Sequence, residues 1–404
     1  MTRPSVIFIN RAYPPDRAVS GFLLRDLAEC LAREGWSVTV LATGGKTEQS
    51  GANGVTLTSI RVPEGRDFFK SAYTWLRLCL SACRMPRHDI VITLSDPPMV
   101  YVAGYLHARF KKTKHVHWCH ELYPDLFGAL GYRLPDRVGR TLLKYSRRIF
   151  KSCSAVVSIG QCMQKYLTQT GMDMTRLYVI PNWADRDVVS TERQPPLPVR
   201  ADIQGAKPQD RLIRDTSTRF RILYAGSIGR EHPMQSVLDA AQLLQVHAEI
   251  EFLFAGHSAG FERLARERDR RGLTNIRFIP YQPAQLLRHM MESADIHLVT
   301  QRLETTGMLV PCKTYSAFAV GRPCLYLGHS GTETARMIEA YHAGQVIPPG
   351  DAQALADAIL TYRMKRDIWD QVHQGALRAG LDYTPGMSMS LWVQLLDKII
   401  KSSS

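Results

Sequence analysis

The 404-residue sequence has no long apolar run, because no stretch reaches the roughly 18 uncharged apolar residues that a membrane span needs. Its eight cysteines are scattered and do not show disulfide or zinc spacings, which favours a reducing compartment. No secretory leader is visible, since Met1-Thr-Arg-Pro leads directly into the short apolar run at residues 6–9. These absences predict a cytoplasmic protein that does not cross a membrane.

Several sequence motifs of well-known chemistry are also missing. No G-x-G-x-x-G follows the first expected strand, which argues against a dinucleotide redox cofactor. Gly44-Gly-Lys-Thr47 ends like a phosphate-binding P-loop, but Val40 stands where that motif needs a glycine. His115, His117 and Cys119 alternate along one expected strand, and either a zinc site or a strand buried on both faces explains them. With no fourth ligand evident, we expect no metal and no other cofactor.

Positive charge is in excess: 51 Lys and Arg against 37 Asp and Glu give a formal net charge of +14. One basic helical face is expected within residues 136–151, and it is either a solvated surface or a contact for anionic lipid head groups or a polyphosphate. A second helical segment, residues 66–84, mixes large apolar residues with Lys70, Arg77 and Arg84, and fits a core helix or a segment in a bilayer interface. No nucleic-acid-binding motif is found, so an anionic membrane surface ranks above nucleic acid as a partner.

Short apolar runs alternate with helical patterns, which is typical of βα units on parallel sheets. We predict an α/β fold of two doubly wound Rossmann-like domains facing across a cleft, with a C-terminal helix crossing back to the first domain. Ligands of such sheets bind beyond the carboxyl ends of the strands. The expected domains are residues 1–185, a proline-rich linker at 186–218, residues 219–380, and a C-terminal helix within 381–404 after a break at Pro385-Gly386.

The expected strands place several candidate binding residues at their carboxyl ends. In the first domain the strands are residues 6–9, 37–43, 89–95, 114–119, 155–159 and 177–180. In the second domain they are residues 220–224, 250–255, 276–281, 296–300 and 324–327. Arg230 and Lys313 follow a glycine turn and a loop of the second domain, each near the start of a helix. Two cations at helix N-termini make a plausible clamp for a diphosphate.

Several motifs, in the same order and at similar spacing, resemble glycosyltransferase family 4 over nearly the whole chain. They are Ile180-Pro-Asn-Trp183, Tyr224-Ala-Gly-Ser-Ile-Gly229, Val310-Pro-Cys-Lys-Thr-Tyr315, Ala319-Val-Gly-Arg-Pro-Cys324 and Gly331-Thr-Glu-Thr-Ala-Arg336. Ser95-Asp-Pro-Pro98 and His120-Glu-Leu-Tyr-Pro-Asp125 resemble the branch that builds bacterial cell-surface polysaccharides on lipid-linked sugars. The resemblance implies the two-domain GT-B fold, a nucleotide diphosphate sugar donor, retention of anomeric configuration and no metal.

The resemblance also implies roles for individual residues. The catalytic candidates are His120, beside the transferred sugar, and Arg230 and Lys313, which would stabilise the departing diphosphate. The implied substrate-binding residues are Ser20, Gly21, Glu121, Asn182, Gly226, Ser227, Gly229, Tyr281, Met308, Leu309, Val310, Thr314, Ser316, Thr332 and Glu333.

The sequence departs from the family pattern at four positions. Met308 and Ser316 stand where the family usually has two glutamates, which implies altered donor recognition. His232 replaces the usual lysine of the glycine turn, and Ser227 replaces the arginine after Gly226.

We therefore predict a retaining, metal-independent glycosyltransferase that moves a sugar from a UDP- or GDP-sugar to an acceptor hydroxyl. The expected acceptor is a lipid-linked saccharide of cell-surface polysaccharide biosynthesis. We expect the protein to bind it at the cytoplasmic face of the inner membrane. Two alternatives stay open. One is a nucleotide-sugar epimerase of the same fold, although no convincing carboxylate pair is evident for it. The other is a degenerate nucleotide-sugar-binding or scaffold protein, which the missing glutamates favour.

Overall fold

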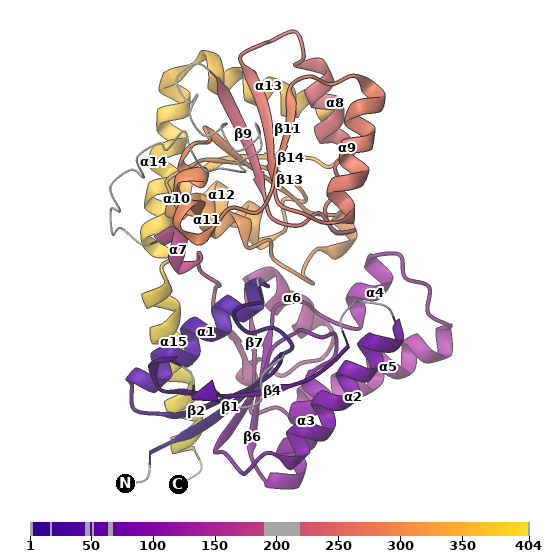
Figure 1. Ribbon diagram of the computed structural model, residues 1–404, viewed down its shortest axis with the longest axis vertical. Coiled ribbons are helices and arrows are strands. Elements are labelled where there is room, and N and C mark those ends of the chain that lie inside the picture. Colours follow the sequence, from indigo (N-terminus) through magenta and orange to yellow (C-terminus); the bar gives the residue numbers. More distant parts are fainter. Residues whose placement is uncertain are drawn as a thin grey trace. The chain divides into compact units, whose positions relative to one another are not determined.

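The computed structural model describes residues 3–16, 18–44, 49–50, 52–63, 68–189 and 219–402. The chain forms two compact units (Figure 1). Unit 1 comprises Met1–Asn182, Gly307–Val310 and Gly386–Ser404, and unit 2 comprises Trp183–Thr306 and Pro311–Pro385. Each unit is a Rossmann-like α/β fold built on its own sheet, which is wholly parallel in unit 2 and mostly parallel in unit 1, and this confirms the predicted fold class.

The sheet of unit 1 has the strand order β3-β4-β2-β1-β5-β6-β7-β8, and all of its pairings are parallel except that of β3 with β4. The chain order reverses between the neighbouring strands β1 and β5, and this is the switch point where ligands of such sheets bind. The strands are β1 Ser5–Ile9, β2 Ser37–Thr43, β3 Gln49–Ser50, β4 Val55–Ile60, β5 Ile90–Thr93, β6 Lys114–Cys119, β7 Ala155–Ser158 and β8 Leu177–Val179.

Helices pack against this sheet because its central strands are apolar on both faces. On one face Ile7, Ile9 and Val91 form a core with Leu78 of α2 and Ala103 of α3. The helices of unit 1 are α1 Val19–Arg33, α2 Phe68–Arg84, α3 Tyr101–Lys111, α4 Asp125–Ala129, α5 Asp136–Ser152, α6 Gln161–Gln169 and α15 Pro385–Lys401.

The C-terminal helix α15 belongs to unit 1 from Gly386 onward. Trp392 is fully buried, and its ring centroid lies 4.8 Å from that of Trp118. Lys114 Nζ donates to the carbonyl of Ile399 at 2.7 Å. The expected break at Pro385-Gly386 is wrong, because Pro385 is the first residue of the helix, a position where proline's missing N–H costs no hydrogen bond.

Unit 2 has a six-stranded, fully parallel sheet with the order β11-β10-β9-β12-β13-β14. Its switch point lies between β9 and β12. The strands are β9 Phe220–Ala225, β10 Ile250–Ala255, β11 Ile276–Ile279, β12 Ile296–Thr300, β13 Cys324–Leu327 and β14 Gly344–Ile347. The helices are α7 Arg186–Val189, α8 Gln235–Leu243, α9 Ala259–Arg271, α10 Ala284–Glu292, α11 Lys313–Ala319, α12 Glu333–Tyr341, α13 Ala352–Met364 and α14 Arg366–Asp382.

Alternate residues of β9 and β10 face opposite layers of unit 2. Ile222 and Phe252 pack in the core that includes α8, α9 and α13, whereas Leu223 and Leu253 pack in the core that includes α7 and α10. Part of the expected linker is therefore structured, since α7 begins at Arg186. The remainder of that linker, residues 190–218, lies outside the described residues.

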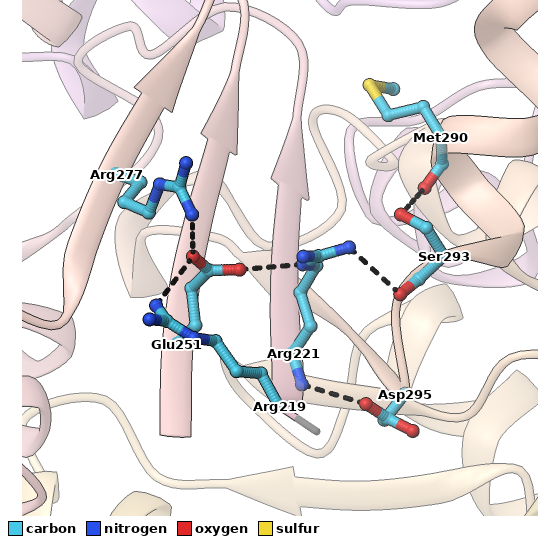
Figure 2. A network of polar contacts seen from close by, with 7 residues as sticks. All are labelled: Arg219, Arg221, Glu251, Arg277, Met290, Ser293 and Asp295. Atoms are coloured by element: carbon cyan, nitrogen blue, oxygen red, sulfur yellow. Dashed lines mark hydrogen bonds and ion pairs between the residues drawn. The ribbon is translucent and has the colours of Figure 1, made fainter. Parts of the chain in front are cut away.

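A cluster of charged side chains lies at the amino ends of strands β9, β10 and β11 of unit 2 (Figure 2). Glu251 of β10 accepts from Arg221 Nε of β9 at 2.8 Å and from Arg277 Nη1 of β11 at 2.7 Å. Arg219 also approaches its carboxylate, at 3.5 Å. Burial raises the pKa of Glu251, but the hydrogen bonds and charges of Arg221 and Arg277 outweigh it and hold the pKa below its usual value. The cluster lies at the edge opposite the carboxyl ends, so it is a structural feature of the sheet.

Candidate functional site

The switch point of unit 2 gathers four residues from three elements. Gly226 follows β9, Thr300 ends β12 and Lys313 begins α11, while His232 lies in the loop between β9 and α8. Gly226 has φ +120°, and a Cβ added to it would lie 3.1 Å from Lys313 Cε. Glycine is therefore required at position 226 for two reasons: it can adopt this backbone conformation, and it leaves the space that the lysine side chain fills.

Lys313 is surrounded by neutral groups and by one acidic side chain. Its Nζ lies 4.9 Å from the centroid of the Tyr224 ring and 3.4 Å from His232 Nε2. Glu231 Oε1 lies 3.6 Å from the same His232 nitrogen. Burial lowers the pKa of Lys313 to about 8, and the nearby Glu231 acts in the opposite direction. The ammonium group is thus mostly charged at neutral pH although it has lost much of its hydration.

His232 is fixed in one tautomer by its backbone partner. Its Nδ1 lies 2.8 Å from the carbonyl oxygen of Thr300, so Nδ1 carries the proton and donates it. Nε2 is then the unprotonated nitrogen, and it accepts from Lys313 Nζ. Burial, and after it the positive charge of Lys313, hold the pKa of His232 well below its usual value. A neutral imidazole therefore orients Lys313, at the position where the family pattern usually has a lysine.

The other predicted residues of the glycine turn lie around this cluster. The carbonyl of Ser227 accepts from the hydroxyl of Tyr224 at 2.8 Å. Arg230 is exposed, and its carbonyl accepts from Arg302 Nε at 3.1 Å. A Cβ added to Gly229 would lie 2.3 Å from the Glu231 carboxylate. The structure thus places His232 and Tyr224 against Lys313, whereas we expected Arg230 to share the diphosphate clamp.

Further predicted residues of unit 2 differ in exposure. Thr314 is fully buried beside Lys313, Ser316 is half-buried, and Tyr281 beyond β11 is exposed. Thr332 caps α12 by accepting from the N–H of Ala335 at 3.2 Å. Its hydroxyl also donates to Tyr326.

Glu333 is a buried carboxylate in the first turn of α12. It is paired with Arg336 of the same helix, whose Nε donates to it at 3.0 Å. Arg336 also donates to the hydroxyl of Tyr383 at 3.2 Å. This pairing ties α12 to the end of α14 and gives Glu333 a structural partner within unit 2.

In unit 1, His120 directly follows β6 and is buried. Its backbone N–H donates to Ser95 Oγ at 2.9 Å, and its ring meets that of Trp118 edge-on at 4.6 Å. Among the described residues no group hydrogen-bonds its Nε2. Burial lowers the pKa of His120 to about 3, and the neighbouring His117 adds to this effect. His120 is therefore neutral at physiological pH.

The switch point of unit 1 lies beside the start of α1. Asn10, just after β1, donates from Nδ2 to the Ala12 carbonyl at 2.8 Å and to Ser20 Oγ at 3.4 Å. A Cβ added to Gly21 would lie 3.2 Å from the same carbonyl, so glycine lets α1 approach this loop closely. Asn182, another predicted binding residue, is fully buried in unit 1.

Met308, Leu309 and Val310, which the family resemblance places among the substrate-binding residues, belong to unit 1. Leu309 forms an isolated antiparallel bridge with Glu121, and the carbonyl of Met308 accepts from the N–H of Leu122 at 2.8 Å. Leu309 packs with apolar residues of α4 and its neighbours.

Asp125, the last residue of the motif that begins at His120, connects three helices of unit 1. At the start of α4 it forms an ion pair with Arg147 of α5, and it accepts from the Tyr166 hydroxyl of α6 at 3.0 Å.

Two family models match the two halves of the chain. The model described as Glycosyltransferase Family 4 matches residues 21–188, and the one described as Glycosyl transferases group 1 matches residues 219–363. Both halves of the chain thus match glycosyltransferase models, and the first half matches that of family 4.

Similar proteins include bacterial proteins named as glycosyltransferases. A protein named as a colanic acid biosynthesis glycosyl transferase, WcaI of Escherichia coli, is 25% identical over 57% of this chain and 55% of its own length. WbjE of Pseudomonas aeruginosa, named as a glycosyltransferase, is 25% identical over 68% of this chain and 66% of its own. The matched part therefore spans somewhat less than two thirds of either relative.

Solved structures share the GT-B fold at low identity. Sucrose-phosphate synthase from Thermosynechococcus elongatus has a TM-score of 0.75 at 14% identity, over 99% of this chain and all of the other. Anabaena HepE, solved with UDP and glucose, has a TM-score of 0.72 at 15% identity, over 98% of this chain and all of the other.

The sequence pattern did not point to Tyr224, Glu231 or Thr300 as site residues. Thr300 is the last residue of a strand that we predicted with the right bounds, and its place at the carboxyl end could have marked it as a site residue. The buried pair His115 and His117 shares Thr93 Oγ1, at 2.9 and 3.1 Å, which agrees with a strand covered on both faces. Within the described ranges no group of three or more His, Cys, Asp or Glu is arranged to hold a metal ion.

Proposed function

We propose that this chain is a retaining glycosyltransferase that takes a sugar from a UDP- or GDP-sugar and passes it to a lipid-linked saccharide. One observation carries the proposal: a single lysine, Lys313, is held at the switch point of unit 2 beside a glycine turn. A cation at this edge of a Rossmann-like sheet suits a diphosphate. The solved complex of HepE with UDP and glucose supports the same ligand class.

In this proposal Lys313 binds the diphosphate and stabilises the negative charge that grows on it as the sugar leaves. The partly desolvated ammonium interacts more strongly with an anion than a fully hydrated one does. His232 positions the ammonium, since its Nδ1–H is committed to Thr300 and its unprotonated Nε2 faces Lys313. Arg230 adds a second cation from the exposed turn, and Gly226, Ser227 and Gly229 line the same loop.

His120 acts on the transferred sugar as a neutral hydrogen-bonding group. With its pKa near 3, it is not an acid at neutral pH. Its buried Nε2 lacks a partner among the described residues, and a sugar hydroxyl would satisfy it. The acceptor hydroxyl attacks from the face that the leaving phosphate occupies, and that phosphate takes the proton, so configuration is retained without a metal or a protein nucleophile.

The acceptor belongs to cell-surface polysaccharide synthesis, as the name of the relative WcaI suggests. We place the enzyme at the cytoplasmic face of the inner membrane. Helix α5 supports this placement, because its cations are largely exposed: Arg137, Arg140, Lys144, Arg148 and Lys151.

A transfer assay tests the reaction. Purified protein is incubated with UDP- and GDP-sugars and with a short polyprenyl diphosphate saccharide, with and without EDTA. The proposal expects one donor to be consumed, EDTA to have no effect, and the new linkage to keep the anomeric configuration of the donor by NMR. Inversion at the anomeric carbon, or a requirement for metal, would refute the mechanism. Donor binding without transfer to any acceptor would favour a degenerate binding protein.

A further inference from the structure

Helix α2 presents an apolar stripe to solvent on the side opposite the core. The face that packs on the sheet carries Leu78, Cys79 and Ala82. The opposite face carries four exposed large side chains spaced four, three and four residues apart, so they lie in one line along the helix. They are Phe69, Tyr73, Leu76 and Leu80, and Phe69 is 82% exposed. At 1.5 Å per residue the stripe is about 17 Å long.

Among the residues of α2 that the structure describes, the charged side chains beside this stripe are all positive. Lys70, Arg77 and Arg84 recur every seven residues, which places them in a second line next to the apolar one. Helix α2 contains no Asp or Glu. Helix α3, which contacts both α2 and α5 (Figure 1), has no acidic residue either and ends in exposed Arg109 and Phe110.

Helix α5 repeats the same combination at its exposed surface. Val138 and Tyr145 lie seven residues apart and are exposed, and the exposed cations Arg137, Arg140 and Lys144 lie among them. Within α5 the acidic residue is Asp136, at its first position.

We propose that the outer surfaces of α2 and α5 form a docking face for an anionic lipid bilayer, with the α2 stripe inserted among the acyl chains near the head groups. Large apolar and aromatic side chains in line, flanked by Lys and Arg, are the features of a helix that lies in a membrane interface. The excess of cations on these helices complements anionic head groups. No described helix is long and apolar enough to cross a bilayer. The claim that the bilayer contains a lipid-linked acceptor rests on the proposed function. The claim that the protein binds lipid vesicles does not depend on it.

Vesicle co-sedimentation of the full chain tests the docking face. Vesicles of phosphatidylcholine alone are compared with vesicles that contain about one third phosphatidylglycerol, at about 0.1 M salt. Leu76→Gln removes an apolar side chain without adding charge. Its matched control is Leu243→Gln on α8, because Leu76 and Leu243 are both 49% exposed. Arg77→Ala removes one cation, and Arg363→Ala on α13 is its control.

The wild-type chain should bind the anionic vesicles and bind phosphatidylcholine much more weakly. Leu76→Gln should weaken partitioning about tenfold and Arg77→Ala about fivefold, while both controls stay at the wild-type level. The proposal is overturned if the wild type does not bind anionic vesicles, or if Leu76→Gln binds as Leu243→Gln does. An effect of Arg77→Ala without one of Leu76→Gln also overturns it, since that result describes a charged surface for another polyanion, such as RNA or an acidic protein.

The proposal of a docking face and the proposal of a donor site can be refuted independently. Leu76→Gln lies in unit 1 and should leave UDP or GDP binding unchanged, as measured by thermal stabilisation. Vesicle binding without nucleotide binding would leave the docking face standing and remove the proposed donor. Nucleotide binding without vesicle binding would do the reverse.

Discussion

Replacing Glu251 by Gln should destabilise unit 2, because this carboxylate neutralises a buried arginine. Arg221 is 3% exposed and Glu251 is 1% exposed, whereas Arg277 and Arg219 reach solvent. Removing one partner of a buried pair costs about 3–5 kcal/mol, since the other charge is left uncompensated. We expect about 3 kcal/mol, because the amide oxygen of Gln can still accept one hydrogen bond from Arg221.

Urea denaturation followed by tryptophan fluorescence and far-UV circular dichroism measures this loss as a shift of the unfolding transition. Glu339→Gln, an exposed carboxylate on α12, is the control and should change stability by less than about 0.5 kcal/mol. The double variant Arg221→Met with Glu251→Gln also removes the uncompensated buried charge of Arg221, and it should be more stable than Glu251→Gln alone. A double variant less stable than the single one, or a single variant equal to the control, would refute the argument.

The same carboxylate gives a pH dependence with a defined sign. Its pKa is lower in the folded protein than in the unfolded chain, so its contribution to stability is complete above the unfolded pKa. That contribution is lost as the pH falls through the folded value. Acid unfolding of unit 2 should therefore be shallower in Glu251→Gln than in the wild type.

Two further predictions concern the site of unit 2. Nucleotide affinity should fall as the pH rises above about 8, by up to tenfold per unit, because Lys313 loses its charge there. Lys313→Arg should flatten that profile in calorimetric titrations, and an unchanged slope would exclude Lys313 as its source. Gly226→Ala should destabilise the turn by about 1–3 kcal/mol and weaken nucleotide binding, since φ is +120° and the new Cβ would lie 3.1 Å from Lys313 Cε. Gly139→Ala, whose Cβ would meet nothing within 4 Å, is its control, and equal effects of the two changes would contradict this explanation.

The fold was predictable where burial leaves a simple pattern in the sequence. Residues 114–119 and 250–255 were predicted as strands and are β6 and β10 with the same bounds, and both strands are almost wholly buried. The run at 250–255 is apolar except for Glu251, whereas 114–119 alternates histidines with Val116 and Trp118. Strand β4, Val55–Ile60, was missed. It lies one place from the edge of its sheet and alternates apolar with polar residues, so its signal is weaker.

The candidate site was predictable to the extent that strand ends determine it. Gly226 and Lys313 were both expected at carboxyl ends, and the structure places them so close that a Cβ added to Gly226 would lie 3.1 Å from Lys313 Cε. The contact of His232 with Lys313 depends on the conformation of the loop between β9 and α8. Hydrophobic periodicity in the sequence gives no information on the conformation of a loop. The placement of Met308 beside Leu122 depends on pairing between segments almost 190 residues apart, and local pattern carries no information on it.

The most direct test of the account is a calorimetric titration of the wild-type chain and of Lys313→Met with UDP and with GDP, without added metal. Lys365→Met, an exposed lysine of unit 2, is the control. The account predicts that one nucleotide binds the wild type and the control equally. It predicts affinity for Lys313→Met about 10- to 150-fold lower, the range for losing a hydrogen bond to a charged group. Equal affinity in wild type and Lys313→Met, or no binding of either nucleotide, would contradict it.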